Sequence, residues 1–179
     1  ITYRKRSIPI CWTWVAHVKG HSKVEKQIEL LTEVKKLIPP DTEVLLVGDS
    51  EFGAMGLIKE LKKWQWRFSL REKSHVKIRL NGQSEWIKLS DVEIKKGQTL
   101  WLEAAYLSES KSQLVSICVY WKRNEDAPWF LATNLPTPHA TKQAYGRRMW
   151  IEEMFGDMKK NGFDLERTML RHTDRLSCI

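Results

Sequence analysis

Hydrophobic residues recur three or four positions apart in several stretches of the chain, and this spacing predicts helices. The first predicted helix covers residues 22–38 and begins with Ser22 and Glu25 in the pattern of a capping box. A second is expected at about residues 52–64, and a third at residues 143–166, "QAYGRRMWIEEMFGDMKKNGFDLE". Strand patterns separate these helices.

The strand patterns are of two kinds. "EVLLVGD" (residues 43–49) is a continuous apolar run, typical of a central strand buried on both faces, and "WRFSLR" (residues 66–71) predicts the next strand. Around Pro9, β-branched and aromatic residues predict two strands or one bent edge strand. Residues 75–134 alternate between apolar and polar residues and contain an "NG" turn, which predicts consecutive antiparallel strands.

This order of elements predicts an α/β core that carries an antiparallel β insertion. Residues 1–74 would form the first part of the core, residues 75–134 the insertion, and residues 135–179 the helical region that completes the core. A chain of 179 residues is long enough for one such core. Because the chain begins with Ile1 rather than Met, we expect it to be a piece of a longer protein.

Composition narrows the function only slightly. The 30 basic and 22 acidic residues give a formal charge of +8, which favours polyanionic partners but is common among soluble proteins. Cys11, Cys118 and Cys178 have no metal-ligand spacing and suggest a reducing compartment, and the five histidines form no zinc motif. No apolar run approaches the roughly 20 residues that span a membrane.

The predicted helix at residues 143–166 carries a polar stripe beside its apolar one. Tyr145, Arg148, Glu152 and Lys159 stand at offsets 0, 3, 7 and 14. On a regular helix they project within about 60° of one another. Arg148 and Lys159 could contact phosphate oxygens, and Glu152 could bind a metal ion. The alternative is a solvated helix face on which Arg148 and Glu152 form an ordinary i,i+4 ion pair.

Asp49 ends a predicted strand and precedes a predicted helix. Ligands in open α/β sheets gather at the carboxyl ends of strands, where a carboxylate can hold a divalent cation. The alternative is that Asp49 or Ser50 simply caps the following helix.

Together these residues resemble a known family. The spacing Y-(2)-R-(3)-E-(6)-K is the signature of the insertion sequence four family of DDE transposases, and Tyr145, Arg148, Glu152 and Lys159 match it at every position. "GDSEFG" resembles the family's "GDREFG" motif, with Ser50 in place of the usual Arg. "YRKRSIPICW" and "FLATNL" are also similar to family sequence, so the resemblance spans essentially the whole chain.

The resemblance implies an RNase H-like fold, a mixed β-sheet core flanked by helices, with an antiparallel β insertion before the last catalytic helix. It implies catalytic metal ligands at Asp49 and Glu152, which with a third acid would bind two Mg²⁺ ions, or Mn²⁺ as a substitute. Tyr145, Arg148 and Lys159 would bind DNA phosphates.

The expected activity is metal-dependent cleavage and strand transfer in DNA transposition. The expected partners are transposon-end and target DNA and a second copy of the protein in a homodimer on DNA, with no membrane. The resemblance also implies a bacterial cytoplasmic protein that is associated with the nucleoid when bound to DNA. Family members hold a flipped base with aromatic residues of the insertion, but no particular Trp of the nine can be matched to that role.

The family's first acidic ligand has no counterpart in the chain. No Asp lies between Ile1 and Pro40. Asp41 is roughly 26 Å from Asp49 if the strand between them is extended. We therefore expect the first acid to precede Ile1 and the chain alone to be inactive. The alternative is a decayed, non-catalytic remnant that at most binds DNA.

Overall fold

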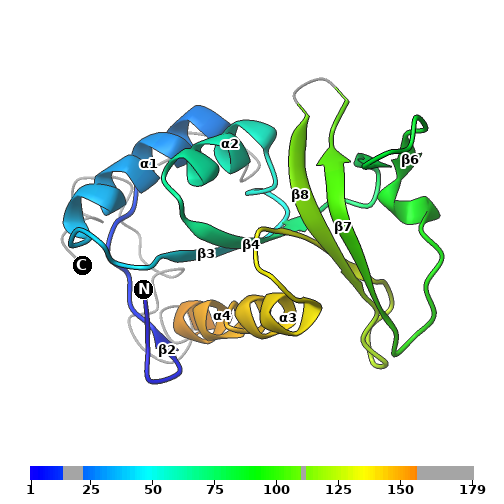
Figure 1. Ribbon diagram of the computed structural model, residues 1–179. Coiled ribbons are helices and arrows are strands. Elements are labelled where there is room, and N and C mark those ends of the chain that lie inside the picture. Colours follow the sequence, from blue (N-terminus) through cyan, green and yellow to red (C-terminus); the bar gives the residue numbers. More distant parts are fainter. Residues whose placement is uncertain (14–21, 110–111, 157–179) are drawn as a thin grey trace.

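The computed structural model describes residues 1–13, 22–109 and 112–156. In this part of the chain a seven-stranded mixed sheet lies between two pairs of helices. Figure 1 shows α1 and α2 on one face of β3 and β4, and α3 and α4 on the other. This is the α/β architecture, consistent with an RNase H-like fold, that the sequence predicts.

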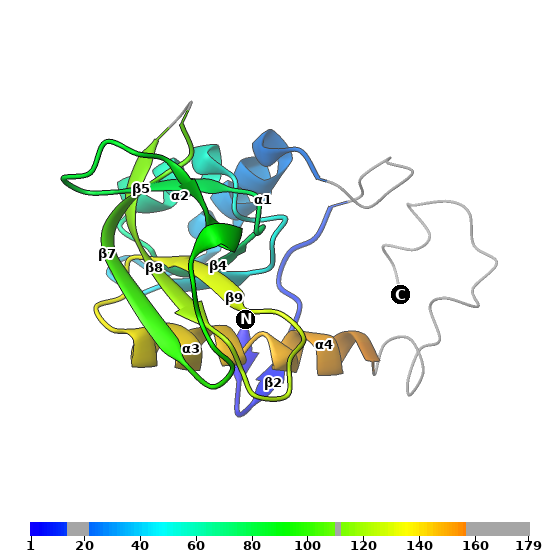
Figure 2. The ribbon, with the colours of Figure 1, turned by 90° about the vertical axis from the view of Figure 1, so that its right-hand side faces the viewer.

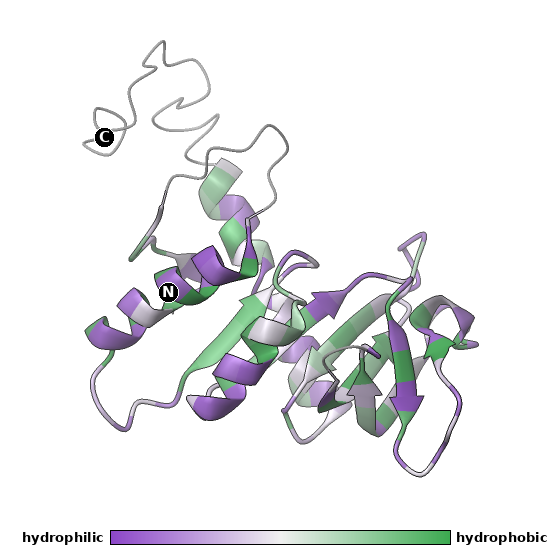
Figure 3. Cartoon of the chain, turned by 90° about the horizontal axis from the view of Figure 1, so that it is seen from above, coloured by the Kyte–Doolittle hydropathy of each residue, from purple (hydrophilic) through white to green (hydrophobic). Residues whose placement is uncertain are grey.

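The first two helices agree with the hydrophobic pattern. α1 spans Val24–Leu37 and α2 spans Met55–Lys63. The predicted capping box is wrong, because no side chain caps α1 and Ser22 Oγ instead accepts a hydrogen bond from Gln27 Nε2 at 2.9 Å. Figure 3, viewed from the side of these helices, shows mostly hydrophilic residues on their outer faces.

The described strands form a small hairpin and one large sheet. The hairpin pairs β1 (Thr2–Tyr3) with β2 (Arg6–Ser7). The large sheet has the order β3-β4-β9-β8-β7-β5-β6. Its strands are β3 (Leu45–Gly48), β4 (Arg67–Glu72), β5 (Lys77–Leu80), β6 (Ile87–Lys88), β7 (Thr99–Leu107), β8 (Gln113–Tyr120) and β9 (Trp129–Thr133), with the short 3₁₀ helix η1 (Leu89–Asp91) after β6.

Pairing in the large sheet confirms the antiparallel character of residues 75–134. Among the described strands, β3 and β4 pair in parallel and every other neighbouring pair is antiparallel. β5 and β6 are joined through the predicted turn, where Gly82 has a φ of +84°. β9 pairs with β4 on one side and β8 on the other, so the strands of this region continue the core sheet.

The sequence predicted a central position for β3, and this is wrong for the described sheet, where β3 is the edge strand. Leu45, Leu46 and Val47 are each half-buried. An apolar run indicates that both faces of a strand are covered. It does not indicate that both edges of the strand pair with other strands. Here helices cover both faces (Figure 1), which accounts for the pattern without a second neighbouring strand.

The hydrophobic core has two parts, one on each face of the sheet. The larger cluster lies under α1 and α2 and includes Leu57, Leu61, Phe68 and Leu70, all fully buried. The smaller cluster contains Cys118, Leu131 and Tyr145, with Val47, Trp101, Tyr120 and Trp129 packed against it. The smaller cluster faces α3 and is therefore part of the surroundings of the candidate site.

The predicted helix at residues 143–166 is divided in the described residues. α3 spans Pro138–Gly146 and α4 spans Met149–Gly156, and Figure 2 shows the two following one another. At the junction, backbone N–H groups donate to carbonyls three residues back: Arg148 to Tyr145 at 3.0 Å and Ile151 to Arg148 at 2.9 Å. Such bonds tighten the turn, so the regular advance of 100° per residue does not hold across it.

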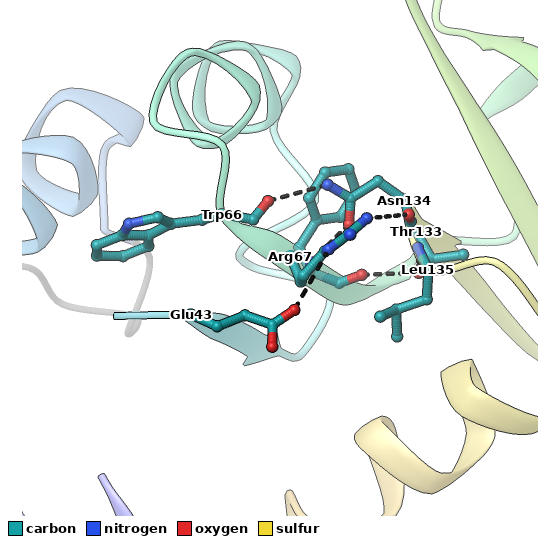
Figure 4. Close-up of polar contacts among 7 residues, drawn as sticks. Glu43, Trp66, Arg67, Thr133, Asn134 and Leu135 are labelled. Carbon is teal, nitrogen blue, oxygen red and sulfur yellow. Dashed lines mark hydrogen bonds and ion pairs between the residues drawn. The ribbon is translucent and has the colours of Figure 1, made fainter. Parts of the chain in front are cut away.

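Side-chain hydrogen bonds of Thr133 and Asn134 attach the end of β9 to the β4 segment, at the point where the chain turns toward α3 (Figure 4). Asn134 Oδ1 accepts from the Phe68 backbone N–H at 2.9 Å, and its Nδ2 donates to the Trp66 carbonyl at 2.9 Å. Next to it, Thr133 Oγ1 donates to the Phe68 carbonyl at 2.7 Å. The Asn134 side chain thereby extends the pairing of β4, and the Thr137 side chain caps the start of α3.

Replacing Asn134 with alanine should lower the free energy of unfolding by about 1–3 kcal/mol, because it leaves a backbone donor and a backbone acceptor unpaired. Chemical denaturation measures the change. Asn124→Ala, in an exposed turn, is the matched control and should change stability by no more than about 0.5 kcal/mol. An equal loss of stability in the two variants would contradict a structural role for the Asn134 hydrogen bonds.

Candidate active site

Asp49 lies immediately after β3, in a tight turn. Its Oδ1 accepts a hydrogen bond from the Glu51 backbone N–H at 3.0 Å, and its carbonyl accepts one from the Phe52 N–H at 3.0 Å. The N-cap of α2 is Ala54, which has no capping side chain. The interpretation of Asp49 or Ser50 as a helix cap is therefore wrong, and Asp49 Oδ2 points away from that turn toward α4.

Two contacts hold this turn in place. A Cβ added to Gly48 would lie 2.7 Å from the Phe52 Cβ, so a glycine is needed for Phe52 to fold back over the strand end. From α1, the buried Gln27 donates through Nε2 to the Glu51 carbonyl at 3.1 Å. The backbone on both sides of Asp49 is thus fixed from the sheet and from α1.

Arg148 brings Asp49 and Glu152 together. Its Nη2 lies 3.7 Å from Asp49 Oδ2, and its Nη1 donates to Glu152 Oε1. The Arg148 side chain is about one-quarter exposed, whereas the side chains of Asp49 and Glu152 are more open to solvent. The strand end and α4 therefore present two carboxylates on one surface. The i,i+4 pair of Arg148 and Glu152 is present, but Asp49 makes it part of a larger cluster.

Tyr145 does not lie on an exposed polar stripe with these residues, which corrects the prediction from helical spacing. It is 3% exposed, and its ring packs edge-on against Trp129 with 5.1 Å between centroids. The division of the helix at Arg147 and Arg148 explains the difference, because α3 turns Tyr145 into the smaller core cluster before α4 begins. Its hydroxyl has no hydrogen-bond partner of normal geometry within the described part of the chain.

The environment of that hydroxyl links it to the carboxylate cluster. Burial raises the pKa of Tyr145, the nearby Arg148 and Arg71 oppose this rise, and Asp49 adds to it. Arg71 is thus a site residue that the sequence reading missed. The parallel register of β3 and β4 accounts for its position: Gly48 pairs with Leu70, which places the next residues, Asp49 and Arg71, side by side.

Aromatic residues of the insertion continue from Tyr145 across the sheet. Tyr120 packs edge-on against Trp129, with 5.9 Å between centroids. Lys142 of α3 places its Nζ 4.6 Å from the centre of the Tyr120 ring and donates to Thr99 Oγ1 at 3.0 Å. These residues form a row of aromatic and cationic side chains, the aromatic wall, which begins at Tyr145. The remaining predicted residue, Lys159, lies outside the described residues.

The oxygen donors of Asp49 and Glu152 suit Mg²⁺ or Mn²⁺. The Arg148 guanidinium already contacts both, which shows that one cationic group can be shared between them. Among the described residues, however, no group of three or more His, Cys, Asp and Glu side chains could hold a metal ion. The described residues thus fit a partial metal site.

The Cys118 thiol is not a candidate nucleophile. Burial raises the pKa of Cys118 to about 11, and Lys142 only partly opposes the rise. The Cys118 thiol is therefore protonated at neutral pH, and its side chain is enclosed in the smaller core cluster.

Comparison with known proteins identifies the family. No curated protein matches the chain. None of the described helices has the length and apolar character required to cross a membrane. The family model described as "Transposase DDE domain" matches residues 14–179, which is most of the sequence. This chain therefore belongs to the transposase DDE domain family.

Proposed function

We propose that the chain is the catalytic part of a transposase of the insertion sequence four type, which cleaves DNA at transposon ends and joins those ends to target DNA. The observation that carries the proposal is the shared contact of Asp49 and Glu152 with Arg148, at the carboxyl end of a β-strand. Strand ends are where open α/β sheets bind ligands. Arg71 lies beside this cluster and adds a second guanidinium group, with the buried Tyr145 packed behind it.

Asp49 and Glu152 act in this proposal as two ligands for a pair of divalent cations. When bound, Mg²⁺ supplies Lewis-acid activation of the phosphodiester and lowers the pKa of the attacking water. The turn around Asp49 keeps one ligand fixed on the sheet, and α4 supplies the other. The third carboxylate of the family set comes from outside the described residues.

The basic residues then bind and orient the DNA strand. Arg148 can exchange one of its carboxylate contacts for a phosphate oxygen, which a planar guanidinium binds in bidentate fashion. Arg71 lies on β4, next to β3. In this proposal it contacts the adjacent phosphate of the DNA strand that Arg148 binds. Lys159 provides a further phosphate contact. The Tyr145 hydroxyl is buried beside Arg71 and Arg148, so in this proposal it orients those guanidinium groups rather than touching DNA itself.

Arg148→Ala should weaken binding to transposon-end DNA and reduce the slope of log Kd against log salt by about one, because one phosphate contact is lost. Fluorescence anisotropy over a range of salt concentrations measures both quantities. Lys26→Ala, on the exposed side of α1, removes the same charge on the opposite face of the sheet and should leave the slope unchanged (Figure 1). Identical slopes for wild type and Arg148→Ala would make Arg148 a structural residue.

The second candidate function is that of a remnant that binds DNA without cleaving it. The absence of a third carboxylate beside Asp49 and Glu152 in the described residues favours this candidate. Both candidates share the basic surface, so DNA binding does not separate them. The DNA sequence upstream of the Ile1 codon does: an open frame with an Asp at a strand end supports the enzyme, and a stop codon or frameshift supports the remnant.

A further inference from the structure

A cavity of about 540 Å³ opens at the carboxyl end of β4, beside the turn that holds Asp49. Its lining residues are Ser50, Arg71, Glu72, Lys73, Ser74, His75, Ser90, Ala127, Pro128 and Phe130. Ser50 directly follows Asp49, and Arg71 also lies near the Tyr145 hydroxyl, so the cavity adjoins the carboxylate cluster. Successive strand residues face opposite sides, which places Glu72 with Leu70 on the side of α2.

Glu72 is the buried acid of this cavity. It is 5% exposed, and its Oε1 has no hydrogen-bond partner among the described residues. A Cβ added to Gly53 would lie 2.6 Å from Glu72 Oε2, so the carboxyl group rests directly against the glycine backbone. Burial raises the pKa of Glu72 well above its usual value. The neutral acid is therefore favoured, and it offers an O–H donor at the cavity wall.

Basic and hydroxyl groups make up most of the remaining polar lining. Arg71, Lys73 and His75 are the basic residues, and Ser50 and Ser74 contribute hydroxyl groups. The Ser90 hydroxyl donates its hydrogen bond to Asp91 Oδ1 at 3.0 Å, so it does not serve as a donor to a group in the cavity. With Glu72 neutral, the cavity presents hydrogen-bond donors and positive charge, which is the environment that a phosphate group requires.

We propose that this cavity is a second phosphate-binding pocket, which takes a phosphodiester group of the DNA strand that passes Asp49. The inference rests on the proposed function, because it assumes a DNA strand at the carboxylate cluster. Lys73 and His75 supply charge at the rim, Ser50 and Ser74 donate hydrogen bonds, and Glu72 donates from the wall. The pocket thereby extends the DNA path from Arg148 across the end of β4.

The rim is tested by Lys73→Ala combined with His75→Ala. The double variant should bind a short transposon-end duplex more weakly and reduce the salt slope by about one to two, depending on the charge of His75. Lys59→Ala combined with His139→Ala removes the same residue types at exposed positions that do not line the cavity and should have no such effect. An unchanged slope in the rim variant, while Arg148→Ala still weakens binding, would overturn the pocket and leave the proposed function intact.

The protonated state of Glu72 is tested by Glu72→Gln, which keeps the shape and an N–H donor. Above neutral pH the variant should bind the duplex at least as tightly as the wild type. The affinity of the variant for the duplex should also lack the part of its pH dependence that comes from ionisation of Glu72. Because Arg71, Lys73 and His75 also line the cavity and Asp49 directly precedes its Ser50, wild type and variant are compared in a His75→Gln background. Weaker binding by Glu72→Gln would show that the carboxylate accepts from a ligand, and the phosphate assignment would fail.

A stability measurement checks that Glu72→Gln is folded and that the acid is neutral. Since the folded-state pKa of Glu72 is raised, the folded chain holds its proton over a pH range in which the unfolded chain has lost it. Stability contributed by this group is therefore lost as pH rises through that range. Glu72→Gln should remove this loss and melt at a higher temperature above neutral pH. A lower melting temperature at every pH would contradict a neutral Glu72.

Titration with inorganic phosphate tests whether the cavity binds phosphate at all, and titration with the duplex tests whether DNA supplies that phosphate. Added to the wild type, phosphate should shift the backbone amide resonances of Ser74 and His75, and the shift should vanish in the rim double variant. The duplex should shift the same resonances. A response to phosphate alone would assign the pocket to free phosphate rather than DNA, and no response to either would overturn it.

Discussion

Glu152→Ala and Asp49→Ala should each reduce divalent-metal-dependent nicking of transposon-end DNA by at least about a hundredfold, since metal activation provides several kcal/mol of transition-state stabilisation. The two carboxylates share one guanidinium and are proposed to share the cations. The assay uses labelled end DNA with Mg²⁺ or Mn²⁺ and a protein extended to supply the proposed third acidic ligand. Glu153→Ala is the matched control, because Glu153 is exposed on the same helix and should tolerate the change.

The 179-residue chain without that extension should show no useful cleavage, because Mg²⁺ binds weakly to a sparse set of carboxylates. Addition of EDTA should abolish nicking by the extended protein. Robust cleavage by the unextended chain that survives Glu152→Ala would show that the active site lies elsewhere.

The sequence predicted the fold better than it predicted how the site residues are oriented. Helical spacing located α1 and α2, and alternation with an "NG" turn located the antiparallel strands. These patterns report burial, which depends on local sequence. The edge position of β3 depends instead on which strands pair across the whole sheet, and the apolar run "VLLVG" contains no information on that point.

Within the candidate site, the residues were proposed from a motif and not from helical geometry. Asp49, Arg148 and Glu152 lie together as the resemblance implied. Tyr145 was placed on the wrong face because a single regular helix was assumed, and the tight junction at Arg148 could not be seen in the hydrophobic spacing. The contribution of Arg71 depends on the parallel register of β3 and β4, which only the paired strands reveal.

Glu72 illustrates a different limit. In the sequence it is one acidic residue in "LREKSH", with no spacing that distinguishes it from a solvated charge. Its burial follows from the approach of the Gly53 backbone from another segment of the chain. Long-range contacts of this kind decide whether an acid is ionised, so the donor character of the cavity could not be inferred before the fold was known.

Tyr145→Ala should lower the free energy of unfolding by about 3–5 kcal/mol, because it empties the space that a buried ring fills against Trp129. Tyr145→Phe keeps the ring and removes a buried hydroxyl whose polar neighbours are Arg71 and Arg148, so its stability should change by no more than about 1 kcal/mol. Denaturant titration of both variants measures the difference. A large loss of stability in Tyr145→Phe would show that the hydroxyl already has a structural partner.

The phenylalanine variant also separates packing from DNA binding. If the buried hydroxyl orients Arg71 and Arg148 for DNA, Tyr145→Phe should bind end DNA several-fold more weakly, since a hydrogen bond contributes about 1 kcal/mol. The salt slope should stay the same, because no charge is removed. Tyr120→Phe is the control, as it removes a hydroxyl from the neighbouring aromatic wall while keeping the contact with Trp129. Unaltered DNA affinity in Tyr145→Phe would limit Tyr145 to a role in packing.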